Sequence, residues 1–358
     1  MILKIAITAD NHLTSQAKNP ERFLALADIF KQCGELGVQL LIVAGDLFDQ
    51  SLANYAEFEA LYQSSRPNDL TTVIIPGNHD RQLNRSAIAG ESLQVYSEPT
   101  IRPLNESRLV LFLPYQENRT MGEAIAPFAD QLAGKRWFLV GHGDWSASLN
   151  AADPYEQGSY MPLTTADIKR YQPEIVILGH IHLSQQSGLV YYPGSPCPLN
   201  ISETGIRKFL VLDTDKGEIT SQVVNSHLLF IDEHLLILPV ANDLELLEKD
   251  FSKRREAWDI PGDRVDQIQI RLKISGCSYS DRQMVYDKVN GLIKPYRLYQ
   301  DAAPDLGDLV HSHDPDRAEI TTLFMEYLDR LDWEGKSLQP DKGQVLEQAL
   351  RRIYRVTP

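Results

Sequence analysis

Five short polar motifs in the first half of the sequence each follow an apolar run of strand length. The runs are Leu3 to Ala9, Leu40 to Ala44, Thr72 to Ile75, Trp137 to Val140 and Ile175 to Leu178. The motifs that follow them are Asp10-Asn11-His12, Gly45-Asp46-Leu47-Phe48-Asp49, Gly77-Asn78-His79-Asp80, Gly141-His142-Gly143 and Gly179-His180-Ile181-His182. In open α/β sheets, ligands gather in the loops beyond the carboxyl ends of the strands. We therefore expect the five motifs to converge on one site.

The pattern of apolar residues predicts the fold class. Asn19 and Pro20 offer an N-cap and a first helical position before apolar residues at helical spacing, and Asn54 to Ser64 is a second expected helix. Further strands are expected at Leu109 to Leu113, Val190 to Tyr192, Phe209 to Asp213 and Ile219 to Val224. Helices and strands alternate early and strands dominate later. This order predicts an α/β fold, a layered sandwich of mixed β-sheets flanked by helices.

The character of the sequence changes after about residue 235. Leu235 to Pro239 is expected to be a linker or an edge strand. A small α/β unit follows, with a strand at Gln267 to Ile274, a helix at Ser280 to Ile293 and a strand at Arg297 to Gln300. A polar stretch from Ala302 to Arg317 then precedes two amphipathic helices. We predict three parts: a catalytic domain at residues 1–235, a small α/β domain at 236–310 and a helical tail at 311–358.

Composition limits the kinds of partner. The formal net charge of −14 argues against a basic face that coats nucleic-acid phosphates, although bound divalent cations supply positive charge locally. No apolar run approaches the ~18 residues that a membrane span needs. The apolar start runs directly into the first motif and is interpreted as a strand rather than a signal peptide. Three scattered cysteines indicate a reduced compartment, so we expect a cytoplasmic protein.

The residue types in the motifs indicate a metal site. Any one motif has a simpler explanation as a turn or a helix cap, but five of the nine histidines lie in this set. Imidazoles, carboxylates and one amide suit Mn²⁺, Fe²⁺ or Zn²⁺ better than Ca²⁺. Seven candidate ligands are too many for one ion and suit two. Two ions ~3.5–4 Å apart can clamp the attacking and leaving oxygens of a phosphoryl displacement.

The order of the motifs, over roughly residues 5 to 185, resembles the signature of the calcineurin-like metallophosphoesterases. The resemblance implies two divalent ions, for which we expect Mn²⁺. It assigns one ion to Asp10, His12 and His182, the other to Asn78, His142 and His180, and a bridging role to Asp46.

The same resemblance implies the catalytic roles. His79 matches a histidine that contacts the scissile phosphate and protonates the leaving oxygen. Asp49 and Asp80 are expected to orient imidazoles. Because some relatives carry a second catalytic histidine where this sequence has Asp49, the resemblance does not establish a two-histidine mechanism here. The two cations would lower the pKa of a water so that hydroxide exists near neutral pH.

Three features resemble the SbcD group of nucleases within this superfamily. The segment from Tyr191 to Pro196 is similar to their Tyr-Pro-Gly-Ser motif, which makes Gly194 and Ser195 candidate substrate-binding residues, although a Pro-Gly turn also explains it. The small α/β unit stands where these nucleases carry a DNA-capping domain. The helical tail stands where they dock on an SMC-type ATPase, although helices that pack on their own domain would show the same periodicity. The resemblance implies DNA as substrate, an exonuclease and endonuclease role in DNA repair and recombination, an SbcC-like ATPase partner and a nucleoid association.

Three alternatives remain open at this point. One is a small-molecule or cyclic-nucleotide phosphodiesterase of the same superfamily, whose residues after 235 would close over a small pocket. Another is an inactive subunit that anchors an ATPase, which the intact set of seven ligand positions and His79 disfavours. The third is a protein phosphatase, which the small α/β unit and the segment from Tyr191 to Pro196 disfavour. The resemblance also implies a homodimer, formed through Asn54 to Ser64 or the stretch near Ala87 to Tyr96.

Overall fold

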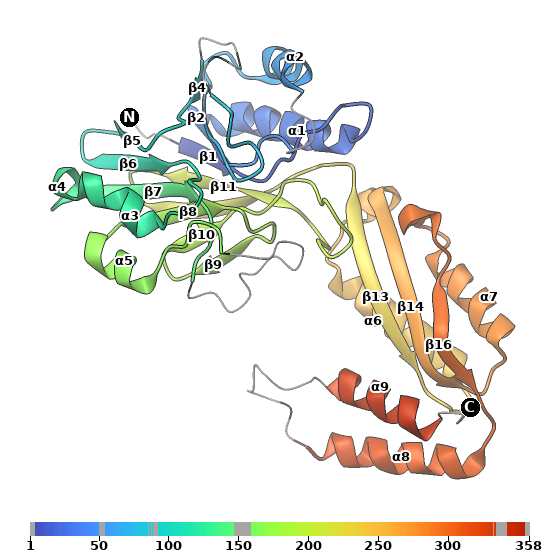
Figure 1. Ribbon diagram of the computed structural model, residues 1–358. Coiled ribbons are helices and arrows are strands. Elements are labelled where there is room, and N and C mark those ends of the chain that lie inside the picture. The colour runs from blue at the N-terminus through green and yellow to red at the C-terminus, as the bar shows by residue number, and fades with distance from the viewer. Residues whose placement is uncertain are drawn as a thin grey trace. The chain divides into compact units, whose positions relative to one another are not determined.

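The computed structural model describes residues 4–49, 54–84, 86, 88, 92–146, 159–331, 333 and 342–354, and the chain divides into two compact units (Figure 1). Unit 1 comprises Met1–Leu199 and Ile206–Leu228. Unit 2 comprises Asn200–Gly205 and Leu229–Pro358.

Unit 1 is built on two six-stranded mixed sheets. The first sheet contains, in spatial order, β12 (Glu218–Val223), β11 (Lys208–Asp213), β1 (Lys4–Thr8), β2 (Leu40–Ala44), β3 (Thr71–Ile75) and β4 (Leu93–Val95). The second contains β5 (Thr100–Pro103), β6 (Arg108–Leu113), β7 (Arg136–His142), β8 (Ile175–Gly179), β10 (Val190–Tyr192) and β9 (Gln185–Ser187). The central strands are parallel in both sheets, β1 to β4 in the first and β6 to β8 in the second. Their carboxyl ends therefore lie at one edge of each sheet.

The two sheets face each other across one core and carry helices on their outer faces. Ile7, Ile42 and Val73 from the first sheet pack with Phe112 and Phe138 from the second. Helices α1 (Pro20–Leu36) and α2 (Tyr55–Ser65) lie outside the first sheet, and three short helices lie outside the second (Figure 1). Those three are α3 (Met121–Ile125), α4 (Ala129–Leu132) and α5 (Thr165–Tyr171). Burial on both faces explains why the central strands are continuously apolar in sequence.

Helix α1 shows how local signals set the bounds of an element. Pro20 is the first helical residue, and Gly37 ends the helix in the left-handed region at φ 66°. Asn19 occupies the N-cap position but makes no side-chain capping bond. Its amide contacts Glu21 instead, so the expected cap is correct in position and wrong in its bonding.

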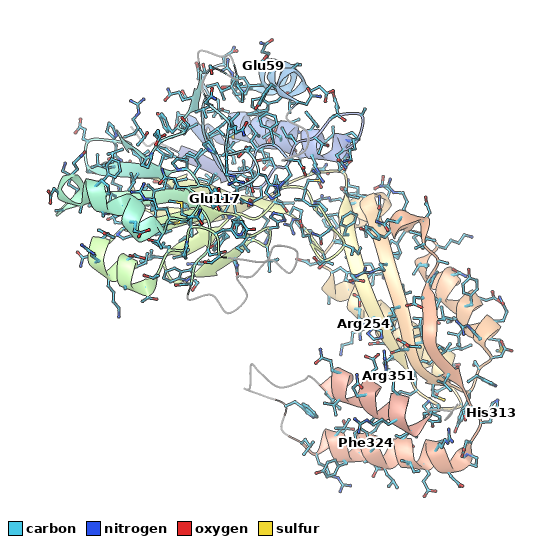
Figure 2. The ribbon with its side chains drawn as sticks, viewed as in Figure 1. Glu59, Glu117, Arg254, His313, Phe324 and Arg351 are labelled. Carbon is cyan, nitrogen blue, oxygen red and sulfur yellow. The ribbon has the colours of Figure 1, made fainter. Side chains whose placement is uncertain are left out.

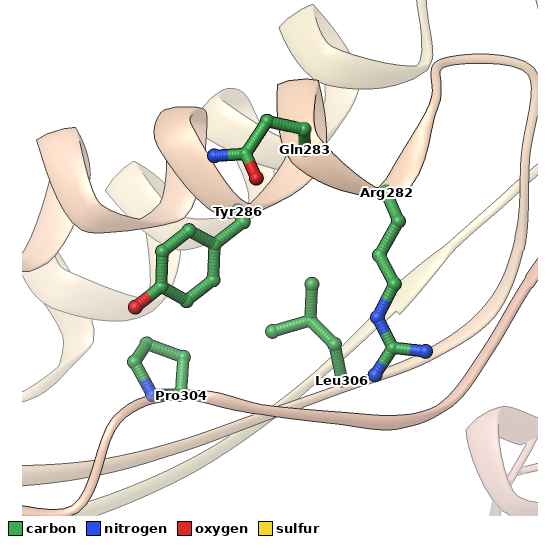
Figure 3. A pocket seen from close by; sticks show the side chains of 5 residues that line it. All are labelled: Arg282, Gln283, Tyr286, Pro304 and Leu306. Atoms are coloured by element: carbon green, nitrogen blue, oxygen red, sulfur yellow. The ribbon is translucent and has the colours of Figure 1, made fainter.

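Unit 2 contains a parallel sheet and four helices among its described residues. Its strands are β13 (Leu229–Ile237), β14 (Ile268–Ser278), β15 (Arg297–Leu298) and β16 (Asp305–His311), and β14 pairs with each of the others. Helices α6 (Asp243–Ala257) and α7 (Arg282–Ile293) connect strands and contribute to the core through Leu247, Phe251, Val285 and Val289. A cavity of about 490 Å³ opens beside α7, lined by Arg282, Gln283, Tyr286, Pro304 and Leu306 (Figure 3).

The last two helices, α8 (Pro315–Asp329) and α9 (Lys342–Ile353), pack against β14. Leu328, Leu346 and Leu350 bury around Cys277. Arg351 of α9 (Figure 2) bonds Asp308 of β16 at 2.8 Å, and Asp308 lies 2.6 Å from Lys273 of β14. These ion pairs attach α9 to the edge of the sheet that carries β16.

The predicted sandwich of mixed sheets flanked by helices is confirmed in unit 1. Three details after residue 228 differ from expectation. The expected strand at Arg297 to Gln300 continues only to Leu298, the polar stretch from Ala302 to Arg317 contains β16, and α6 was not anticipated. Of the two expectations for Leu235 to Pro239, a linker or an edge strand, the structure has the edge strand, which begins at Leu229 and ends at Ile237. The predicted three-part division at residues 235 and 310 stays a prediction.

Candidate metal centre

The fold brings the five motifs to the carboxyl ends of five parallel strands. Asp10 and His12 follow β1, Asp46 follows β2, and Asn78, His79 and Asp80 follow β3 in the first sheet. His142 is the last residue of β7, and His180 and His182 follow β8 in the second sheet. Backbone bonds tie the first two loops together: Asp10 N donates to Gly45 O at 3.1 Å and His12 N to Asp46 O at 3.0 Å.

One group of side chains gathers Asp10, His12 and His182, whose ligand atoms lie within 4.8 Å of one another. Asp10 Oδ1 accepts a hydrogen bond from His180 N at 2.9 Å. Asp10 Oδ2 and His12 Nε2 are buried and have no hydrogen-bond partner among the described residues. A buried carboxylate oxygen and a buried imidazole nitrogen left in this way are costly, and a bound cation would satisfy both. The donor set therefore fits a divalent metal ion.

A second group gathers Asp46, Asn78, His142 and His180. His142 Nε2 lies 2.8 Å from Asn78 Oδ1 and 3.2 Å from Asp46 Oδ2. Asn78 Oδ1 is also 3.2 Å from His180 Nδ1. These four ligand atoms crowd together at separations suited to neighbouring ligands of one ion. Asp46 also approaches the first group, with its Oδ2 3.8 Å from His12 Nε2, so one carboxylate reaches both groups.

The electrostatics of the metal-free centre follow from burial. Burial raises the pKa of the Asp10 carboxyl to about 6, against the opposing effect of His142 and His182. Burial also tends to raise the pKa of Asp46, but His142, and then His12, hold it well below its usual range. Burial lowers the pKa of His12, which keeps that imidazole in the neutral form that binds metals. Asp46 and His142 form a buried ion pair, because the carboxylate raises the pKa of His142 despite its burial.

The backbone at this edge is strained. Asp10, His12, Asp46 and His180 all have positive φ, at 53°, 45°, 51° and 100°. Non-glycine residues rarely adopt such values, and they concentrate at functional sites. Glycines allow the close approach of the loops: a Cβ at Gly45 would lie 2.0 Å from His142 Nδ1, and a Cβ at Gly77 would lie 2.1 Å from Asp46 Oδ1.

Two of the three predicted catalytic residues, His79 and Asp80, lie beside the two groups. His79 N donates to Asp46 Oδ1 at 2.9 Å, and its ring meets that of His12 edge to face at 4.6 Å. Asp80 is buried and accepts from Gly77 N at 2.7 Å and Phe48 N at 3.2 Å, so its described bonds fix two loops rather than an imidazole. Burial, and then Asp46, raise the pKa of Asp80 to about 7.

The remaining predicted residues have clear positions. Asp49 lies 3.8 Å from Arg22, which also donates to His12 O. Ser195 is fully buried; its N donates to His182 O at 3.0 Å and its hydroxyl accepts from Arg207 at 2.7 Å. Gly194 has φ 76°, and a Cβ there would lie 2.7 Å from His182 O. The described contacts of Gly194 and Ser195 thus support the backbone of His182, and their substrate-binding role stays a prediction.

Sequence reasoning missed residues that surround the ligands. Asp144 Oδ1 lies 3.5 Å from His180 Nε2, and Asp144 Oδ2 accepts from Tyr160 N at 2.7 Å. The Tyr160 ring lies 4.5 Å from that of His180, and Arg207 also donates to His182 O. Asp144 stands two residues after His142, and this proximity to a motif residue could have identified it from the sequence. Nothing in the local sequence marks Tyr160 or Arg207.

Residues 3–184 match the protein-family model described as calcineurin-like phosphoesterase. The chain belongs to this family. Members of this family are phosphoesterases, hydrolases that use divalent metal ions, and the ligand cluster is consistent with that chemistry. Membership also confirms the predicted fold class.

Known proteins similar to this member of the family include an uncharacterized metallophosphoesterase, YhaO of Bacillus subtilis (strain 168). YhaO is 24% identical over 244 residues, which are 61% of this chain and 57% of YhaO. The match thus spans little more than half of that relative.

Similar solved structures include an archaeal phosphodiesterase, 17% identical with a TM-score of 0.34, covering 62% of this chain and 99% of that one. A dimetal phosphatase from Danio rerio is 11% identical with a TM-score of 0.43, covering 63% and 96%. In the part of the chain that the structure describes, no helix has the length and apolar character to cross a membrane.

Proposed function

We propose that this phosphoesterase is a metal-dependent DNA nuclease, the SbcD-like subunit of a complex with an SMC-type ATPase. The observation that supports phosphodiester hydrolysis most directly is the close approach of Asp10, His12, Asp46, Asn78, His142, His180 and His182 at the carboxyl ends of the strands. Two of their buried atoms, Asp10 Oδ2 and His12 Nε2, accept no hydrogen bond from a described residue. Asp10, His12 and His182 would hold one ion, and Asn78, His142 and His180 the other, with Asp46 shared. We propose Mn²⁺ as the native ion.

Divalent ions bound there would supply Lewis-acid stabilisation of the phosphate oxygens and lower the pKa of water. The chain itself positions the groups that act on the substrate. The bond from His79 N to Asp46 Oδ1 fixes His79 at the rim of both ligand groups. From that position the half-buried imidazole can donate a proton to the departing oxygen. Asp80 holds the loops that carry Asp46 and His79 in register through its bonds to Gly77 and Phe48.

An exposed apolar stripe on α8 supports the partner proposal. Ile320, Leu323 and Tyr327, followed by Leu331, are 41–61% exposed and recur at spacings of three and four residues. This spacing is typical of a helix that packs against another helix. Isolated exposed apolar residues are ordinary, but a continuous stripe indicates an interaction surface. We propose that the stripe docks on the coiled-coil base of the ATPase, which would place the protein on DNA in the cytoplasm, associated with the nucleoid.

The proposed homodimer has two candidate surfaces. Helix α2 buries Phe58 and Tyr62 against its own unit, which leaves its polar face available. In the second stretch, Ala87 and residues 89–91 lie outside the described residues. Dimerisation through either surface is a proposal that measurement of the mass in solution can test.

The test uses the purified chain with Mn²⁺ on end-labelled linear DNA and on bis-p-nitrophenyl phosphate. Asp46→Ala is the inactive control, and Asp130→Ala, which removes an exposed carboxylate from α4, is the matched control. Metal-dependent degradation of the DNA, lost only in Asp46→Ala, is the expected result. Hydrolysis of the small diester with DNA intact, even after addition of the ATPase, would replace the nuclease with a small-molecule phosphodiesterase.

A further inference from the structure

A cavity of about 390 Å³ adjoins the metal centre on the far side of His79. The loop after β2 and the start of α2 form one wall, through Phe48 and Tyr55. The loop after β3 forms the other, through Arg81, Gln82 and Leu83. The volume lies within the ~300–1,000 Å³ range of small-molecule sites. Because His79 lines both the cavity and the metal centre, a molecule bound across His79 would occupy both.

The inner wall of the cavity is apolar and aromatic. Phe48 and Leu83 are each 1% exposed. The Phe48 ring meets Tyr55 edge to face at 5.0 Å and Phe58 at 5.6 Å. These contacts hold the half-buried Tyr55 ring in place. A fixed aromatic ring that lines a cavity is suited to stacking against a flat ring system.

The charged groups of the cavity are already engaged. Arg81 pairs with Glu117 at 2.6 Å, and Asp80 accepts two backbone hydrogen bonds. Asp49 carries a carboxylate that would repel a second phosphate. Among the described lining residues, no lysine or arginine lacks a carboxylate partner. The cavity is therefore better suited to a neutral group than to an anion.

Gln82 supplies the polar recognition that such a group would need. Its side chain is exposed and lines the cavity. An amide both donates and accepts, which matches the edge of a nucleobase.

We propose that this cavity binds the nucleobase of the leaving nucleoside, with Tyr55 as the stacking residue and Gln82 at the base edge. The inference rests on the proposed phosphodiester hydrolysis, in which His79 faces the departing oxygen. A phosphate at the metal centre then has its leaving group on the side of His79 where the cavity lies. Tyr55 and Gln82 would thus select nucleic-acid substrates over simple diesters.

The test compares thymidylyl-thymidine with two analogues, each carrying an abasic tetrahydrofuran residue at one of the two positions. Product analysis identifies the side that is released without phosphate. We expect removal of the leaving-side base to lower kcat/KM about 5- to 150-fold, the range of stacking on an aromatic side chain. The measured quantity is the ratio of kcat/KM for the dinucleotide to kcat/KM for the analogue without the leaving-side base. Tyr55→Ala should bring this ratio near 1, Tyr55→Phe should retain it, and Gln82→Ala should lower it in part. A ratio near 1 in the unmodified chain, or one that survives Tyr55→Ala, overturns the proposal.

A binding measurement separates failure of this proposal from failure of the proposed function. If no diester is hydrolysed, saturation-transfer NMR with thymidine still tests the cavity without turnover. Transfer from the protein to the base protons, lost in Tyr55→Ala and kept in Tyr55→Phe, supports the cavity as a nucleobase site. Absence of transfer, or transfer unaffected by Tyr55→Ala, overturns it.

Discussion

The two units bury carboxylates in opposite ways. In unit 1, Asp10 is fully buried, yet one of its oxygens accepts no hydrogen bond from the part of the chain that the structure describes. In unit 2, Asp243 is 3% exposed and accepts five hydrogen bonds. The donors are Leu244 N, Ser278 Oγ, Tyr279 N, Ser280 N and Ser280 Oγ, at 2.5–3.0 Å.

The difference distinguishes a carboxylate that serves a ligand site from a carboxylate that stabilises the fold. Asp243 joins the start of α6 to the loop between β14 and α7, and hydrogen-bond donors that the chain provides stabilise its charge. The centre around Asp10 and Asp46 has strained backbone and incomplete bonding, which persist only where function needs them. A buried carboxylate with too few hydrogen-bond donors thus indicates a binding site for a ligand. A buried carboxylate with a full set of donors indicates a role in the stability of the fold.

The sharpest test of this contrast is Asp46→Ala. Because this carboxylate reaches both ligand groups, we expect the variant to lose both metal ions and to fall to background hydrolysis of bis-p-nitrophenyl phosphate. Metal content by elemental analysis and turnover measured on the same sample check both effects. Retention of two ions per chain would show that Asp46 is not the shared ligand.

His79→Ala should separate metal binding from chemistry. Its ring lies beside the ligands, and we propose that it donates a proton, so turnover should fall about 10²- to 10⁴-fold while metal content stays near normal. The loss should be smaller for substrates whose leaving group needs no proton, such as p-nitrophenolate, than for dinucleotides. Equal losses on both substrates would exclude the protonation role.

Much of the metal centre could be predicted because the relevant signals are local. Leu40 to Ala44 is a strand with the predicted bounds, since an unbroken apolar run suits a parallel strand buried on both faces. Each motif lies at the carboxyl end of its strand, so the position of Asp46 or His180 at the sheet edge follows from the strand itself. The roles of the individual ligands came from the family resemblance and stay predictions.

The residues that were missed depend on contacts distant in sequence. Arg207 supports His182 from 25 positions away, and Asp144 reaches His180 across 36 positions. Helix α6 buries only Asp243, Leu247 and Phe251, so its apolar stripe is too narrow to stand out among its charged residues. Strand β16 lies in a stretch rich in aspartate and glycine, where its pairing with β14 outweighs weak strand propensity.

Asp243→Ala should destabilise unit 2 without affecting catalysis. Removing the carboxylate leaves buried donors without an acceptor, and we expect a loss of about 3 kcal/mol in the free energy of unfolding. Chemical denaturation measures the loss, with the exposed Asp266→Ala as matched control. Hydrolysis of the small diester at a temperature below the unfolding transition should stay within about twofold of the unmodified chain. A large loss of activity in the still-folded variant would contradict the assignment of Asp243 to stability and of Asp10 to the metal centre.

The smallest expected effect is the pH dependence of the same site. Burial tends to raise the pKa of Asp243, but the hydrogen bonds from Ser278 and Ser280 lower it below its usual value. A lowered pKa in the folded state means that the unfolded chain takes up the proton first as the pH falls. The stabilisation is therefore complete above the ordinary pKa of an aspartate, ~3.9, and is lost as the pH falls through the lower folded value. We expect the difference in unfolding free energy between the unmodified chain and Asp243→Asn to be constant from pH 8 to 5 and to shrink by pH 3.

The buried Asp80 should behave in the opposite way in the metal-free protein, because its pKa is raised to about 7. Its contribution falls as the pH rises from ~4 to 7, so Asp80→Asn should gain stability relative to the unmodified chain over that interval. Urea denaturation in EDTA at pH 3, 5 and 8 measures both trends. If the contributions of Asp243 and Asp80 to the free energy of unfolding changed with pH in the same direction, the two carboxylates would not differ in the way proposed.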